Sequence, residues 1–413
     1  MGPRKIANSR RPPRIRLAME QRPASQKASQ TYYFILVPAV LLGTFGLMMG
    51  FSATSVTHIA QGVNPYQPFL RTLMIAAAAL VIATVAALLP PRWWERWAFT
   101  IFVASLILQL LVIPFGITEG GNTNWLNIPG INQSFQPSEF LKLGTALMLG
   151  RVLSGHPINP KSARDVALWV GIPSALAMAS VMAGGDMGTM LVFVAIVVGA
   201  LWMGGVPGRW LGYLGLAGTG LLAFLVTLSP SRVRRILEFL PGGGRAPDPS
   251  APTQTDHGLW ALGSGGLTGV GPGASKEKWN YLQEAHTDFI LAIIGEEFGL
   301  VGTITLLMVV GALIYGIFRL SAQSPNGFVR ASSGAIGAWI AAQTLINVGT
   351  VIGLVPVIGV PFPLVSYGGS SFLFTALAIG VLLSFARYDV TAVSTETDPP
   401  RSDATSTKKR KAS

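Results

Sequence analysis

The sequence contains no cysteine and has few charged residues. Of its 413 residues, 12% are charged and 50% are hydrophobic, and the mean hydropathy is +0.50. The absence of cysteine excludes disulfide bonds and thiol catalysis. Soluble globular domains carry about 25% charged residues, so this chain has too little charge for a soluble domain of its length. The composition therefore predicts a protein of the membrane.

Apolar runs near the length of a bilayer-spanning helix recur along the chain. About 20 apolar residues in a helix cross the hydrocarbon core. The runs predict an all-α, polytopic integral membrane protein with about ten transmembrane helices. They are Tyr33–Gly50, Phe69–Leu89, Phe99–Phe115, Glu139–Leu153, Val166–Ala183, Met187–Met203, Leu211–Leu228, Phe289–Phe318, Gly334–Leu354 and Phe372–Phe385.

The basic residues, which give a formal net charge of +12, are unevenly distributed. They gather in the two termini and in the short connections on one side of the predicted bundle. The short connections on the other side, 52–68 and 355–369, contain neither Lys nor Arg. This positive-inside pattern predicts that both termini are cytoplasmic. Basic tails beside anionic lipid explain the charge, so we expect no nucleic-acid partner.

The chain divides into a membrane domain and two tails. Residues 1–31 and 389–413 are rich in polar and charged residues and predict disordered cytoplasmic tails around a transmembrane domain over 32–388. On the outer side, residues 229–288 predict a large extracellular loop. Its glycine-rich run, Gly263–Gly273, predicts tight backbone turns.

Four motifs follow one another in the membrane domain: Phe135–Lys142, Gly185–Thr189, Glu284–Glu297 and Pro363–Ser371. In this order the chain resembles the SEDS family of FtsW, RodA and SpoVE, and Glu284–Ile290 is most similar to FtsW. The resemblance covers roughly residues 120–386. Two departures from the family pattern are Asn124 before Trp125, where relatives have an arginine, and Gly184–Gly185 before Asp186.

The resemblance implies a peptidoglycan glycosyltransferase that polymerises lipid II into β-1,4 glycan strands. The donor is an α-linked undecaprenyl diphosphate, so one displacement with inversion gives the product. A sugar hydroxyl is a poor nucleophile, and a carboxylate must accept its proton. Asp288, at the junction of the large loop and an apolar run, is the expected catalytic base. The alternative is that Asp288 only caps the helix beginning at Phe289.

Other residues of the motifs are expected to bind substrate or to support the fold. Glu139 and Lys142 can pair on one helix, and Lys142 or arginines of the outer loop can neutralise diphosphate. Glu296, Glu297 and Asp186 have structural explanations in ion pairing and turn formation. The expected substrate-binding residues are Lys142, Glu139, His286, Arg232, Arg235, Lys276, Trp125 and Ser370.

The resemblance also implies partners and a cellular place. We expect a class B penicillin-binding protein and other division proteins as partners, at the septum of a bacterial cytoplasmic membrane. The four histidines are scattered, so no metal cluster is expected, although Mg²⁺ or Mn²⁺ could accompany the diphosphate. The rival functions are a lipid II flippase, an elongation-type RodA paralogue and a non-catalytic division scaffold.

Overall fold

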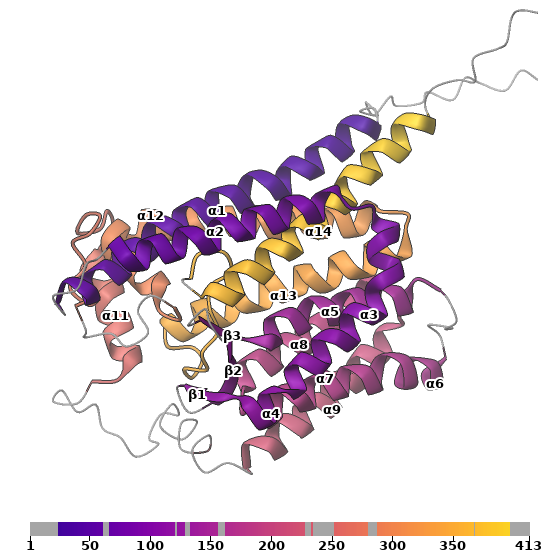
Figure 1. Cartoon of the computed structure of the whole chain (residues 1–413), viewed down its shortest axis with the longest axis horizontal. Helices are drawn as coiled ribbons and strands as arrows, with labels where there is room; N and C mark the ends of the chain where they lie inside the picture. The colour runs from indigo at the N-terminus through magenta and orange to yellow at the C-terminus, as the bar shows by residue number, and fades with distance from the viewer. Residues whose placement is uncertain are drawn as a thin grey trace, which may run out of the picture.

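The structure is a computed structural model that describes residues 24–60, 66–119, 122–128, 133–155, 162–227, 233, 252–279, 287–366 and 368–396. Its long helices run side by side in one bundle (Figure 1). The helices of the first half are α1 (Ala24–Ala60), α2 (Tyr66–Leu88), α3 (Pro91–Leu110), α4 (Val112–Phe115), α5 (Pro137–Leu153), α6 (Ala163–Val166) and the π-helix η1 (Ala167–Gly171).

The described residues of the second half form further helices of the bundle and the helix α11 at its end. They are α7 (Ile172–Ala183), α8 (Met187–Met203), α9 (Gly208–Thr227), α11 (Gln254–Gly265), α12 (Ile290–Gln323), α13 (Gly327–Val351) and α14 (Gly369–Glu396). Within the described residues, every predicted apolar run overlaps one helix or consecutive short helices, and 7 of the described helices are long and apolar enough to cross a bilayer. The all-α membrane fold is confirmed.

Helix α13 lies at the centre of the bundle, packed against α5, α8 and α12. Close packing in membranes depends on small residues, which let backbones approach. A Cβ atom on Gly199 of α8 would lie 2.6 Å from the carbonyl oxygen of Gly334 on α13. At this contact the two helices therefore lie close together.

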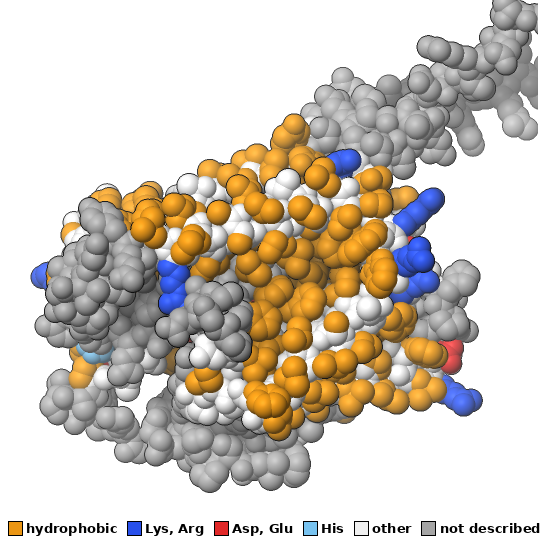
Figure 2. Space-filling model, viewed as in Figure 1, with side chains coloured by type: hydrophobic (Ala, Val, Ile, Leu, Met, Phe, Trp, Pro, Cys, Tyr) orange, Lys and Arg blue, Asp and Glu red, His pale blue; other side chains and the backbone are white. Residues whose placement is uncertain are grey.

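The two ends of the bundle differ in charge. Figure 2 shows hydrophobic side chains along the flanks and a group of Lys and Arg at the end where α1 begins and α14 ends. At this end Arg151 pairs with Glu95 at 2.5 Å. The basic end matches the cytoplasmic side that the positive-inside pattern predicts. The opposite end, which carries α11, is therefore the outer end.

The first outer loop contains a small antiparallel sheet, which the all-α prediction did not include. Its strands, in spatial order, are β1 (Ile117–Glu119), β2 (Asn122–Ile128) and β3 (Gln133–Phe135). The backbone N–H of Thr123 donates to the carbonyl of Gly184 at 2.8 Å. A Cβ atom on Gly184 would lie 2.4 Å from Oδ1 of Asn124. The two departures from the family pattern, Asn124 and Gly184, therefore lie against each other.

Helix α12 is broken at Gly299, where φ is 66° and ψ is −164°. The break separates a buried half-helix, Ile290–Phe298, from the longer part that begins at Leu300. It also releases the carbonyls of Glu296 and Glu297 and the N–H groups of Leu300 and Val301, which would pair with one another in a regular helix.

The segment Gly266–Gly271, hereafter the strap, supplies partners for all four released groups. The N–H groups of Val270 and Gly271 donate to the carbonyls of Glu296 and Glu297 at 2.9 and 3.1 Å. The carbonyls of Gly266 and Leu267 accept from the N–H groups of Leu300 and Val301 at 2.9 and 3.1 Å. A broken helix persists in a membrane only when such groups are satisfied by protein, and the strap meets this condition.

Candidate functional site

Asp288 lies two residues before the start of α12, with its side chain partly exposed. The helix begins at Ile290, and Phe289 occupies the N-cap position without a side-chain hydrogen bond. The helix thus begins one residue later than the capping interpretation assumed, with Phe289 rather than Asp288 in the N-cap position.

Hydrogen bonds from distant segments fix the backbone around Asp288. The amide nitrogen of Asn347 on α13 donates to the carbonyls of Asp288 and of Val360, each at 2.8 Å. The hydroxyl of Ser366 donates to the carbonyl of Thr287 at 2.5 Å and accepts from the N–H of Phe362 at 2.7 Å. The side chains of Asn347 and Ser366 thus join the Asp288 segment to the loop that precedes α14.

That loop, residues 352–366, lies between Asp288 and the start of α8. A Cβ atom on Gly359 would be 3.5 Å from Oδ2 of Asp288, and a Cβ atom on Gly188 would be 2.4 Å from the carbonyl oxygen of Ile358. Leu364 has a φ of 61°, the one positive value among the described non-glycine residues. Strained backbone of this kind is held by surrounding structure and clusters at functional sites.

The depth of Asp288 follows from α13. Ser321 and Arg330 are hydrogen-bonded at 2.6 Å near the cytoplasmic end. Asn347 lies about 26 Å farther along α13 at 1.5 Å per residue. The hydrocarbon core is about 30 Å thick. Asp288, bound to Asn347, therefore lies close to the outer boundary of the hydrocarbon.

A buried polar cluster lies at the outer end of α5. Lys142 Nζ pairs with Glu139 Oε2 at 2.8 Å, both side chains are 1% exposed, and the ammonium lies 4.8 Å from the centre of the Trp339 ring. The Trp339 indole in turn donates to Gln343. Because Glu139 already neutralises it, Lys142 is not a free cation for substrate in this arrangement.

Asp186 joins the same cluster and caps α8. Its carboxylate accepts from the Thr189 N–H at 2.8 Å, from the Thr189 hydroxyl at 2.7 Å and from the Gln136 side chain at 3.2 Å. Burial raises the pKa of Asp186, against the opposing effects of the Thr189 hydrogen bonds and of the Lys142 charge. The Lys142 charge thus acts on both Glu139 and Asp186, in the region where α5, α8 and α13 meet.

Glu296 and Glu297 bind the outer loop rather than the Asp288 region. Glu297 Oε1 pairs with Lys278 Nζ at 2.7 Å, and both side chains are almost fully buried. Glu296 accepts from the Ser275 hydroxyl at 2.5 Å and from the Lys276 N–H at 2.8 Å. The Lys276 side chain is exposed. These contacts tie residues 275–278 to the half-helix that follows Asp288.

The remaining predicted residues are placed as follows. The Ser370 hydroxyl accepts from the Gln136 N–H at 3.4 Å, so the start of α14 joins the polar cluster. Trp125 is partly buried in β2, where it pairs with Ile117 of β1. Arg232, Arg235 and His286 lie outside the described residues.

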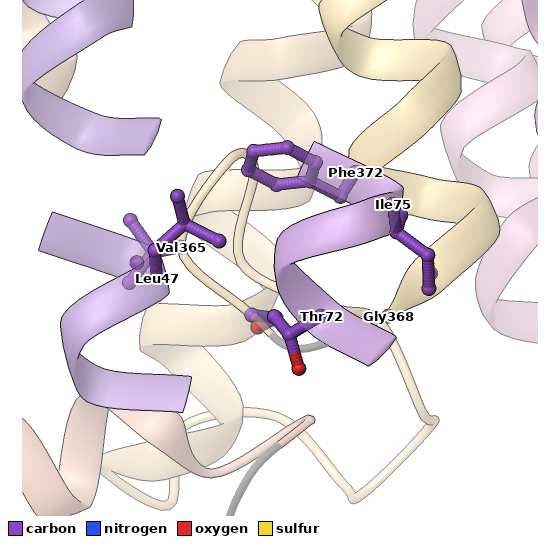
Figure 3. Close-up of a pocket in the computed structure, with 9 residues that line it drawn as sticks. Leu47, Thr72, Ile75, Val365, Gly368 and Phe372 are labelled. Atoms are coloured by element: carbon purple, nitrogen blue, oxygen red, sulfur yellow. The ribbon is translucent and has the colours of Figure 1, made fainter. Parts of the chain in front are cut away.

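An apolar cleft adjoins the Asp288 segment (Figure 3). It is formed by α1, α2 and the start of α14, and Ser366, which holds Thr287, is one of its walls. Its lining residues are Gly46, Leu47, Thr72, Ile75, Val365, Ser366, Gly368, Gly369 and Phe372. Arg71, directly before Thr72, is exposed on α2.

Three residues of this region were missed by sequence reasoning: Asn347, Gln136 and Arg71. Asn347 and Arg71 each interrupt an apolar helix with a polar group, and such residues mark function in membrane helices. That signal was available for both. The role of Gln136 could not be predicted from the sequence, because its partners Asp186 and Ser370 are distant in sequence.

The fold and the site together define a polytopic membrane protein with a carboxylate at the outer edge of the hydrocarbon, beside an apolar cleft. The model of the cell cycle protein family FtsW/RodA/SpoVE matches residues 32–390. The chain belongs to this family.

Individual relatives agree with this assignment. A probable peptidoglycan glycosyltransferase FtsW of Thiomonas intermedia is 35% identical over 83% of this chain and 85% of its own length. Stage V sporulation protein E of Bacillus subtilis is 33% identical over 88% of this chain and 99% of its own. Among solved structures, the rod shape determining protein RodA of Thermus thermophilus has a TM-score of 0.64 and 26% identity, covering 86% of this chain and 96% of that one.

A second solved structure concerns an assembly. One chain of a peptidoglycan synthase complex, described as coordinating polymerization and crosslinking, has a TM-score of 0.67 and 26% identity. The match covers 85% of this chain and 97% of that chain.

Proposed function

We propose that this protein is a peptidoglycan glycosyltransferase that polymerises lipid II. The observation that carries the proposal is the position of Asp288. Its backbone is held by Asn347 and Ser366, it lies near the outer boundary of the hydrocarbon, and an apolar cleft adjoins it. A substrate with a lipid anchor and a sugar headgroup requires this combination. The names of the FtsW relatives support the same reaction.

In the proposed reaction Asp288 is the general base. The 4-hydroxyl oxygen of the acceptor GlcNAc attacks C1 of the donor MurNAc, and its proton passes to the Asp288 carboxylate. The bond from C1 to the diphosphate oxygen breaks, and undecaprenyl diphosphate leaves with the electron pair. The α-linkage becomes β-1,4 by inversion. Positioned proton transfer of this kind contributes about 10²–10⁴-fold in rate.

The diphosphate leaving group needs positive charge more than a proton. Lys276 and Arg71 are exposed cations on the outer half of the molecule, and Arg232 and Arg235 belong to the same outer loop in sequence. Lys142 is paired with Glu139 and buried, so its proposed role is to stabilise the start of α5.

Among the described residues no three His, Asp or Glu side chains converge. A Mg²⁺ or Mn²⁺ ion would therefore take most of its ligands from diphosphate oxygens.

The apolar cleft is the proposed entry of the polyprenyl chain. Leu47, Ile75 and Phe372 give it hydrocarbon walls (Figure 3), and Ser366 connects it to Thr287. A chain lying there would bring its diphosphate to the level of Asp288.

The cellular role proposed is septal wall synthesis, together with a class B penicillin-binding protein that cross-links the new strands. The FtsW names of the relatives support the division role. The synthase complex among the structural neighbours supports a partner that cross-links.

The Asp288→Asn variant tests the reaction directly. We expect purified variant protein, given lipid II in detergent, to lose glycan polymerisation by at least 10²-fold while keeping the wild-type thermal midpoint. Asp256→Asn is a matched control, because it removes a carboxylate from the same outer loop at the start of α11. Polymerisation by Asp288→Asn at the rate of Asp256→Asn would refute the proposed base.

The same assay separates the polymerase from a flippase. In detergent, lipid II is already accessible, so no transport step remains. A polymerase makes glycan strands under these conditions and a flippase makes none.

A further inference from the structure

The strap carries exposed apolar side chains although it belongs to an extracellular loop. Leu267 is 70% exposed and Val270 is 45% exposed. On α11, which leads into the strap, Trp260 is half exposed, with its ring against His257. Exposed apolar side chains in a loop that faces water would be costly, and a group of them indicates a surface that contacts another apolar phase.

The strap continues the lipid-facing surface of α12. Its backbone pairs with Leu300 and Val301, which are 51% and 61% exposed on the flank of the bundle. Farther along the same helix, Ile304 and Met308 are also exposed. Because Leu267 is hydrogen-bonded to Val301, one apolar strip runs from the flank of α12 onto the strap.

The depth of the strap follows from the same helix. From Leu300 to Arg319, near the cytoplasmic end, the helix extends about 29 Å at 1.5 Å per residue. This distance equals the thickness of the hydrocarbon core, about 30 Å. Gly299 and the strap wrapped around it therefore lie where hydrocarbon gives way to headgroups. Trp is enriched at this level, which suits Trp260.

We propose that the strap is a lipid-anchored element: Leu267 and Val270 insert into the outer leaflet, among acyl chains just below the headgroups. The occupant of this apolar surface is the bilayer itself. Because the strap also binds Glu296 and Glu297, the anchor sets the depth of the half-helix Ile290–Phe298. If the proposed function holds, that half-helix places Asp288 at the level of the lipid diphosphate.

The absence of cysteine allows a direct test by site-directed spin labelling of the full chain. The variants are Leu267→Cys and Val270→Cys, with Met308→Cys as the lipid-facing reference on α12 and Lys276→Cys as the water-facing reference in the same loop. Each nitroxide-labelled protein is reconstituted alone in phosphatidylethanolamine–phosphatidylglycerol vesicles. Collision rates are measured with oxygen, which concentrates in lipid, and with an aqueous nickel chelate.

We expect the oxygen-to-nickel ratio at both strap positions to exceed that at Lys276→Cys severalfold and to approach that at Met308→Cys. A ratio equal to that at Lys276→Cys would overturn the proposal, because the strap would face water. Low collision rates with both reagents would also overturn the proposal, because protein would then cover the strap. If that shielding decreased as the lipid-to-protein ratio was raised, the covering protein would be a second copy of this chain. None of these readings depends on catalysis, so failure of the proposed function would leave them unchanged.

Discussion

At the scale of single residues, Asn347 connects three parts of the site. It stands on α13 and binds the carbonyls of Asp288 and Val360 with one amide group. No carboxylate oxygen of Asp288 is involved in these two bonds. Asn347 is therefore a positioning residue, which acts on the reaction through the place it gives to Asp288.

Replacement of this amide should slow the reaction without weakening substrate binding. In Asn347→Leu the two carbonyls lose their donor, and a displacement of about 1 Å in a reacting group costs about 10²-fold in rate. We expect kcat for lipid II polymerisation to fall by that order and KM to stay within about twofold. Thr344→Val, one helical turn earlier, removes only a hydroxyl bonded within α13 and serves as the control. Equal losses in both variants would contradict a positioning role.

At the scale of elements, the break in α12 depends on Gly299. Its φ and ψ lie in a region that is open essentially to glycine alone. A Cβ atom there would also lie 2.4 Å from the Gly269 nitrogen of the strap. The strap and the break thus require each other.

Gly299→Ala should therefore destabilise the protein. Backbone strain alone costs about 1–3 kcal/mol, and the contact with Gly269 adds to it. We expect a lower thermal midpoint in detergent and increased proteolysis within 266–279. Gly311→Ala, in the regular part of α12 where nothing lies within 4 Å of the added Cβ, should be neutral or slightly stabilising. Equal thermal midpoints and equal proteolysis of the two variants would show that the strap does not depend on the break at Gly299.

A second element-scale prediction concerns the buried pair between Lys278 and Glu297. Removal of one member leaves a buried charge without its partner and typically costs about 3–5 kcal/mol. Lys278→Met should lower the thermal midpoint strongly. The double variant Lys278→Met/Glu297→Gln should recover much of the loss, since no unpaired charge remains. Absence of recovery would show that Lys278 acts elsewhere, for example on the substrate diphosphate.

At the scale of the whole molecule, the division role makes a prediction in cells. Depletion of a septal polymerase stops cross-wall formation while side-wall growth continues. We expect depleted cells to fail at septation, and a fluorescent fusion to gather at mid-cell. Expression of Asp288→Asn should restore mid-cell localisation but not division. Loss of cylindrical shape without a septation defect would favour the elongation-type role instead.

The sequence predicted the helices well because the bilayer imposes a simple local rule. Each span must be a long apolar run, so the spans can be read one at a time. The position of Asp288 beside such a run was also a local signal. The small sheet at 117–135 was missed, since it depends on pairing between short polar segments and on its contact with Gly184.

The sequence by itself determined the class of protein, its orientation and the motifs that carry the chemistry, because composition, charge asymmetry and residue spacing are properties of the chain. Only the tertiary structure decided that Asn347 and Ser366 hold the Asp288 segment, that Lys142 is neutralised by Glu139, and that the strap completes the broken α12. These contacts join segments far apart in sequence. Their geometry is fixed by how the helices pack against one another, which no local pattern encodes.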